Sequence, residues 1–154
     1  MKSSGARHIG REYALRMLYT YDIDAESRDT GGHLPPANWW GSQDRLHVTI
    51  PAEEFANKLV KTIRSHYEDI DSLIREYSHH WRLPRMAPVD RNILRIGVSE
   101  LLYHKNTPTK VILNEALELA KCYGDADSPR FINGILDPLA GKLRAEEDRD
   151  SRTS

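Results

Sequence analysis

The chain has 154 residues, the usual size of one domain, and its formal net charge of −1 provides no overall basic field that would mark a nucleic-acid-binding protein. No apolar run approaches the roughly 20 residues that cross a bilayer, and the N-terminus lacks the apolar core of a signal peptide. The single cysteine, Cys122, excludes an internal disulfide, so we expect a cytoplasmic protein.

The first predicted element is an amphipathic helix from about Arg7 to Asp24. Its buried positions recur at helical spacing and include Ala14, Leu15 and Leu18. Over residues 26–49 this periodicity stops, and glycine and proline pairs mark a loop whose length is uncommon inside a compact domain. Trp39 and Trp40 in this loop could cover the core, serve a partner or anchor the loop, and we favour anchoring.

The N-terminal segment is locally basic. Residues 1–21 hold four lysines and arginines against one acidic residue, and residues 22–30 reverse that balance. Arg7 and Arg11 lie one helical turn apart on the line that continues to Leu18. Two guanidinium groups at this spacing can engage adjacent phosphates of one strand, but they could equally extend into solvent or pair with acids.

Five further helices are expected, which makes the chain all-α because no segment shows the alternation of a strand. Their approximate ranges are Pro51–His66, Ile70–Trp81, Pro88–His104, Thr109–Tyr123 and Ser128–Gly141. The helix from Pro88 is apolar nearly all round, so it belongs at the centre of a bundle. Gly124 is expected to end a helix in a left-handed cap, and Ser128 to cap the next one. Residues 144–154 are charged and are expected to form a flexible tail.

The sequence contains no convincing catalytic set. Cys122 lies beside the core residue Tyr123, and we interpret it as a buried structural thiol. Glu100 extends the buried stripe of the Pro88 helix, where it could be an acid of raised pKa but is more often a structural acceptor. No histidine stands in a metal-binding arrangement and no glycine-rich phosphate loop exists, so we expect no cofactor, no metal and no enzymatic activity.

A second candidate site lies at Asp127–Phe131. The free N–H groups at the start of a helix can receive an anion. Arg130 should face solvent, and Phe131 lies at the edge of the core, where it could stack on an unpaired base. The alternative is that Phe131 is a peripheral core residue.

Three separated blocks resemble the NusB family: Arg7–Tyr19, Val89–Ile96 and the stretch from Val111 to Asp137. The resemblance implies a bundle of about seven helices in two subdomains over residues 7–143. It also implies a transcription antitermination factor that binds boxA-type single-stranded leader RNA together with the ribosomal protein NusE. Such a complex helps RNA polymerase to pass terminators, chiefly on ribosomal RNA operons, and some members self-associate, so a homodimer is possible.

The resemblance also implies which residues act. By position, the RNA-binding residues are Arg7, His8, Arg11, Asp127, Arg130 and Phe131, and Asp90 matches an acidic position near the partner and RNA surface. Two positions depart from the family pattern. His8 stands where arginine is common, which would make one contact depend on pH. Gly10 replaces a usual alanine at a cost of up to about 1 kcal/mol to the helix.

Two alternatives remain open at this point. The first is a helical protein–protein interaction module without an RNA role, supported by Trp39-Trp40 and the near-neutral charge. The second is a stand-alone relative of the RNA-binding domain of ribosomal RNA cytosine methyltransferases. That alternative requires a following cofactor-binding domain, which we do not expect in this chain.

Overall fold

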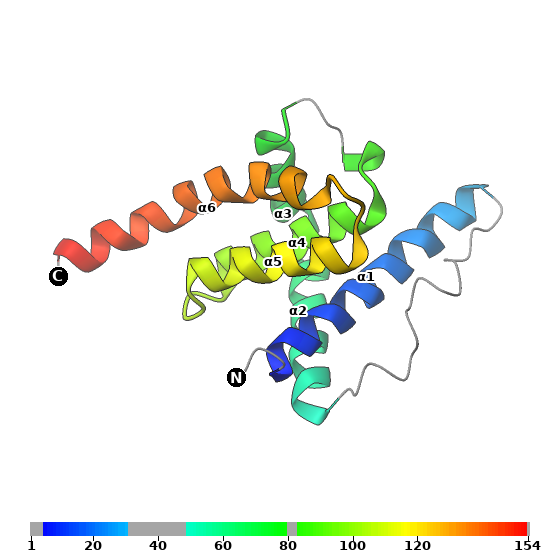
Figure 1. The fold of residues 1–154 in the computed structure, drawn as a ribbon, viewed down its shortest axis with the longest axis horizontal. Helices are drawn as coiled ribbons and strands as arrows, with labels where there is room; N and C mark the ends of the chain where they lie inside the picture. The colour runs from blue at the N-terminus through cyan, green and yellow to red at the C-terminus, as the bar shows by residue number, and fades with distance from the viewer. Residues whose placement is uncertain (1–4, 31–48, 80–82, 154) are drawn as a thin grey trace. The chain divides into compact units, whose positions relative to one another are not determined.

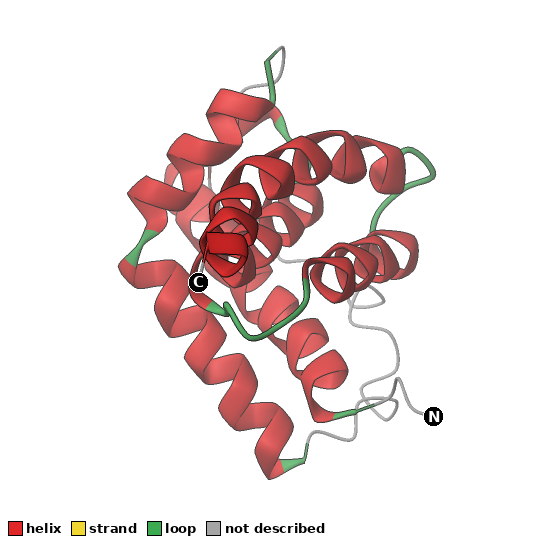
Figure 2. Cartoon of the chain, turned by 90° about the vertical axis from the view of Figure 1, so that its left-hand side faces the viewer, coloured by secondary structure: helices red, strands yellow, loops and turns green. Residues whose placement is uncertain are grey.

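The computed structural model describes residues 5–30, 49–79 and 83–153, which are helical almost throughout (Figure 1). The elements are α1 (Ala6–Thr30), α2 (Ile50–Ser65), α3 (Tyr67–Tyr77), the short 3₁₀ element η3 (Leu83–Arg85), α4 (Pro88–Tyr103), α5 (Thr109–Tyr123) and α6 (Ser128–Thr153). No strand occurs in these described ranges, and the turned view in Figure 2 draws none. The all-α prediction is confirmed, with six α-helices and one 3₁₀ element described where about seven helices were expected.

The chain divides into two compact units, residues 1–64 and 65–154. The first unit contains α1 and nearly all of α2. Its buried apolar residues are Ala14, Leu15, Leu18, Tyr19, Ala52, Ala56, Leu59, Val60 and Ile63. α1 continues to Thr30, beyond the predicted end at Asp24. Trp39 and Trp40, and with them the expected role of their loop, lie outside the described residues.

In the first unit, α1 and α2 approach closely at Gly10. A Cβ atom added at Gly10 would lie 2.7 Å from Cδ1 of Phe55 and 3.0 Å from the carbonyl oxygen of Ala52. The first distance is too short for two carbon atoms and the second is unusually tight, so alanine fits only if Phe55 or the helix backbone shifts. Gly10 therefore weakens the helix by its low helix propensity but permits the close contact between α1 and α2.

In the second unit, α4 is the central element, as its composition predicts. α5 and α6 pack against α4 and against each other, and α3 packs against α4 (Figure 1). Every residue from 89 to 101 is buried. Arg95 meets both carboxylate oxygens of Asp71, at 2.9 Å and 3.0 Å, and Arg91 donates to the carbonyl of Leu83 at 3.0 Å. These hydrogen bonds offset the free-energy cost of burying the two charged guanidinium groups.

α6 extends well beyond Gly141, where the sequence analysis ends the last helix. Residues 144–153, expected to be a flexible tail, continue this helix. Arg144 is 9% exposed, and its guanidinium group donates to five backbone carbonyls at 3.2 to 3.5 Å. The acceptors are Glu100, Leu101, His104, Lys105 and Thr107. Arg144 thereby links α6 to the carboxyl end of α4 and the turn that follows.

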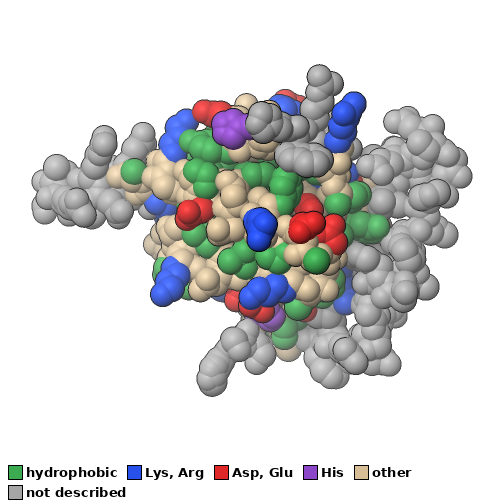
Figure 3. All heavy atoms as spheres, turned by 45° about the horizontal axis from the view of Figure 1, so that its top comes forward, with side chains coloured by type: hydrophobic (Ala, Val, Ile, Leu, Met, Phe, Trp, Pro, Cys, Tyr) green, Lys and Arg blue, Asp and Glu red, His purple; other side chains and the backbone are tan. Residues whose placement is uncertain are grey.

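Two properties of the described part of the chain bear on its function. None of its helices combines the length and apolar character needed to cross a membrane. Its His, Cys, Asp and Glu side chains form no group of three that could hold a metal ion. On the face drawn in Figure 3, basic, acidic and hydrophobic side chains are interspersed, in keeping with the near-neutral total charge.

Candidate nucleic-acid interface

The N-terminal arginines lie on the first two turns of α1, and both meet one aromatic ring. The guanidinium carbon of Arg7 lies 5.9 Å from the centre of the Phe55 ring, and that of Arg11 lies 5.4 Å from it. Arg7 is exposed, whereas Arg11 is only 2% exposed. Arg11 therefore has little surface to present to a ligand, a burial that neither interpretation of the spacing includes. The spacing alone could not show that the ring of Phe55 lies against both side chains.

His8 faces a carboxylate of its own helix. Its Nε2 lies 3.6 Å from Oε1 of Glu12, four residues later, so the two form an ion pair when the imidazole is protonated. The side chain of His8 remains 27% exposed. A phosphate that approached His8 would therefore meet the carboxylate of Glu12 as well.

The start of α6 is capped by Asp125, a residue that the sequence analysis did not single out. Its Oδ1 accepts hydrogen bonds from the backbone N–H groups of Asp127 at 2.9 Å and Ser128 at 3.1 Å. The hydroxyl of Ser128 also donates to this oxygen at 3.3 Å and accepts the N–H of Asp125 at 3.0 Å. Two of the N–H groups at the start of this helix thus already serve a carboxylate of the chain itself.

Gly124 ends α5, but not in the predicted left-handed cap. Its φ is −90° and its ψ is −172°, an extended conformation open to any residue. A Cβ atom on Gly124 would collide with the side chain of Ser128, and would lie 2.9 Å from the carbonyl oxygen of Ala120. The glycine is required because Ser128 packs directly against it.

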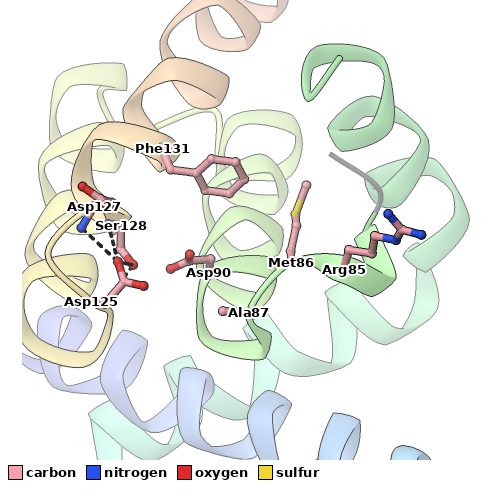
Figure 4. A pocket seen from close by; sticks show the side chains of 8 residues that line it. All are labelled: Arg85, Met86, Ala87, Asp90, Asp125, Asp127, Ser128 and Phe131. Atoms are coloured by element: carbon pink, nitrogen blue, oxygen red, sulfur yellow. Dashed lines mark hydrogen bonds between the residues drawn. The ribbon is translucent and has the colours of Figure 1, made fainter. Parts of the chain in front are cut away.

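A pocket lies between the start of α6 and the approach to α4 (Figure 4). Its lining residues are Arg85, Met86, Ala87, Asp90, Asp125, Asp127, Ser128 and Phe131. Its volume of about 280 Å³ is at the lower limit for small-molecule sites, so it suits one base or one side chain better than a cofactor. The structure thus brings Asp90, Asp127 and Phe131 together around one pocket.

Four other residues that line the pocket were not predicted from the sequence: Arg85, Met86, Ala87 and Asp125. Arg85 and Met86 belong to the segment between α3 and α4, which the sequence identifies only as a connection marked by prolines. Figure 4 shows the side chain of Met86 facing Phe131, while that of Arg85 extends away from the centre of the pocket. Arg130 is exposed, as predicted, but does not line the pocket.

Asp90 gives the pocket its polar character. Burial raises the pKa of its carboxyl, the hydroxyl of Ser128 lowers it, and the negative charge of Asp125 raises it again, so that the pKa lies above its ordinary value of 3.8. The carboxyl oxygen Oδ1 is buried and has no hydrogen-bond partner within the described residues. Such an acceptor is costly unless a donor reaches it. The pocket can therefore take a group with an N–H donor, and it opposes a phosphate.

Cys122 and Glu100, the two residues considered for catalysis, lie outside this pocket. Cys122 is exposed, so the prediction of a buried thiol is wrong: it lies on the outer face of α5, while its neighbours Leu119 and Ala120 face the core. Glu100 is 1% exposed, as its stripe predicts, and its Oε1 lies 3.7 Å from Nδ1 of His104. A buried carboxylate facing a histidine of its own helix agrees with the structural interpretation.

Comparison with known proteins gives one consistent result. The family model described as the NusB family matches residues 8–140. The chain is 43% identical over 140 residues to the "Transcription antitermination protein NusB" of Myxococcus xanthus (strain DK1622), covering 90% of this chain and 97% of the relative. It is 44% identical over 144 residues to the protein of the same name from Geobacter sp. (strain M21), with 92% and 98% covered.

Solved structures agree with this result. The NusB of T. maritima superimposes with a TM-score of 0.72 at 31% identity, covering 92% of this chain and 94% of that one. A crystal structure of the antitermination factors NusB and NusE in complex with double-stranded RNA superimposes with a TM-score of 0.66 at 27% identity, with 89% and 97% covered.

Proposed function

The chain belongs to the NusB family, and on that basis we propose that it is a transcription antitermination factor that binds boxA-type leader RNA together with the ribosomal protein NusE. In this function it acts by binding rather than by catalysis, in the cytoplasm, as part of an RNA polymerase complex on ribosomal RNA operons. The observation that carries the proposal is the similarity, over 89% of this chain, to a NusB that is in complex with NusE and RNA.

We assign the phosphate contacts to the N-terminal arginines. Arg7 is exposed and offers a guanidinium group whose planar donors match phosphate oxygens. Arg11, being 2% exposed, contributes its positive charge from beneath the surface. Arg130, exposed on the first turn of α6, is a third candidate for the RNA backbone, and His8 is a weaker one because Glu12 lies beside it.

We assign a different role to the pocket of the second unit. Three aspartates line it, so it repels phosphate but can accept hydrogen bonds from the amino groups of bases or from basic side chains of a protein. Phe131 is half-buried at its rim, where its ring can stack on an unpaired base. In this proposal Asp127 and Phe131 face RNA, and Asp90 faces the partner or a base that the partner holds in place.

A titration with fluorescently labelled RNA tests the proposal. The full chain is titrated into a boxA-type single strand, with and without NusE, at several salt concentrations. We expect binding that NusE strengthens and that weakens with salt by a log–log slope of about −0.7 for each phosphate contacted. Binding of NusE with no binding of RNA in either titration would instead support the protein–protein interaction module.

A further inference from the structure

We infer that Phe55 on α2 is a positioning residue for RNA binding, because its ring lies against the guanidinium groups of both Arg7 and Arg11. The inference rests on the proposed function and adds to it a residue of a second helix. Phe55 falls in none of the three blocks that resemble the family.

The packing of the two helices fixes the ring. Phe55 is half-buried, and its Cβ and Cδ1 atoms lie close against α1 at Gly10, which has no side chain to displace them. Gly10 lies between Arg7 and Arg11 in the chain, so the ring meets α1 at the point from which both arginines extend. A ring held against backbone in this way has little freedom to move.

The fixed ring restricts the arginines in turn. A guanidinium group within about 6 Å of a ring centre is attracted to the π face, and both distances, 5.9 Å and 5.4 Å, satisfy this limit. The contact uses the charge of the cation but none of the five N–H donors of an arginine, so the donors of exposed Arg7 stay available to phosphate oxygens. An arginine that is already held in place loses less conformational entropy when RNA binds.

A double-mutant cycle tests the inference. Phe55→Leu keeps an apolar side chain but removes the ring, and Phe55→Tyr keeps the ring. We expect Phe55→Leu to weaken RNA binding about fivefold and Phe55→Tyr to bind within about twofold of the wild type. In a background of Arg7→Ala, where the exposed guanidinium is absent, Phe55→Leu should weaken binding further by less than about twofold.

The matched control is Tyr21→Leu. Tyr21 of α1 also has a cation over its ring. The guanidinium carbon of Arg64 on α2 lies 4.2 Å from the ring centre, so this pair joins the same two helices without involving Arg7 or Arg11. Its replacement should leave RNA affinity within about twofold of the wild type. A general weakening of the contact between α1 and α2 would lower RNA affinity in Tyr21→Leu and in Phe55→Leu alike.

Each result has a defined meaning. Wild-type affinity in Phe55→Leu, or an undiminished fivefold loss in the Arg7→Ala background, would overturn the inference while leaving the proposed function intact. Failure of the wild-type chain to bind RNA would overturn the proposed function itself. If circular dichroism shows that Phe55→Leu does not fold, Phe55→Met takes its place in the same cycle.

Discussion

At the first turn of α4, the fold holds Asp90 where its negative charge is disfavoured. Burial and the charge of Asp125 raise the pKa of its carboxyl, and the hydroxyl of Ser128 offsets only part of that rise. Between the ordinary value of 3.8 and the raised value, the folded state keeps a proton that the unfolded state has lost. Stability therefore falls as the pH rises through this window, and the loss persists above it.

Asp90→Asn removes this unfavourable charge. We expect its free energy of unfolding to exceed that of the wild type at pH 7, and the difference to shrink as the pH is lowered toward 3.8. Urea denaturation at pH 7 and pH 4.5 measures both quantities. Asp137→Asn, at an exposed position of α6, is the control for the same change of side chain outside the pocket. A variant less stable than the wild type at pH 7 would show that the charge of Asp90 is compensated in the folded state.

The space around a glycine decides whether alanine can replace it. Alanine at Gly10 gains up to about 1 kcal/mol of helix propensity, but its Cβ would lie 2.7 Å from Phe55 and 3.0 Å from the backbone of Ala52. Because a backbone oxygen cannot move aside as a side chain can, we expect Gly10→Ala to lower the free energy of unfolding by about 1–2 kcal/mol net.

The control for this prediction lies in α6. Gly134 is exposed and has no atom within 4 Å of an added Cβ, so Gly134→Ala should raise the free energy of unfolding by up to about 1 kcal/mol. Urea denaturation of both variants measures these changes in the free energy of unfolding. If both stabilise the protein equally, the contact between Gly10 and Phe55 is looser than the structure describes.

At the scale of whole helices, α4 was predicted almost to the residue because its apolar composition and Pro88 are local signals. The cap at Gly124 was wrong because the glycine serves a contact with Ser128, four residues later, rather than a turn. The end of α6 was placed too early because the burial of Arg144 depends on carbonyls about forty positions away in the chain. Local patterns carry no information about such partners.

The contacts of Arg144 give a prediction for α6. Its guanidinium group donates to five carbonyls at the end of α4 and in the turn that follows. Arg144→Met keeps much of the apolar stem but removes all five of these hydrogen bonds, so we expect a loss of about 2–4 kcal/mol in the free energy of unfolding. Chemical denaturation measures the loss. Lys142→Met, at an exposed position two residues earlier, should leave stability near that of the wild type.

At the scale of the whole molecule, the near-neutral charge and the mixed surface in Figure 3 require any RNA site to be local. The sequence identified Asp127 and Phe131 because they lie in a recognisable block, and the structure places both in one pocket with Asp90. The sequence could not identify Met86 or Asp125 as neighbours of this pocket, or Phe55 as a neighbour of Arg7 and Arg11, since each comes from another segment and has no local signature. Nor could spacing reveal that Arg11 is buried.

The two candidate contact types should respond differently to salt. A cation that meets a phosphate releases counterions, so Arg7→Ala should weaken RNA binding and make the log–log salt slope shallower by about 0.7. A ring that stacks on a base releases none, so Phe131→Ala should cost about 1–3 kcal/mol of binding free energy with an unchanged slope. Fluorescence titrations of one RNA strand between 50 and 200 mM salt, roughly the range over which such contacts are screened, measure both quantities. Arg75→Ala is the control for the loss of one positive charge, because Arg75 is exposed on α3, far along the chain from both candidate contacts. If Arg75→Ala flattens the salt slope as much as Arg7→Ala does, binding follows the net charge of the protein, and the assignment of phosphate contacts to the start of α1 fails.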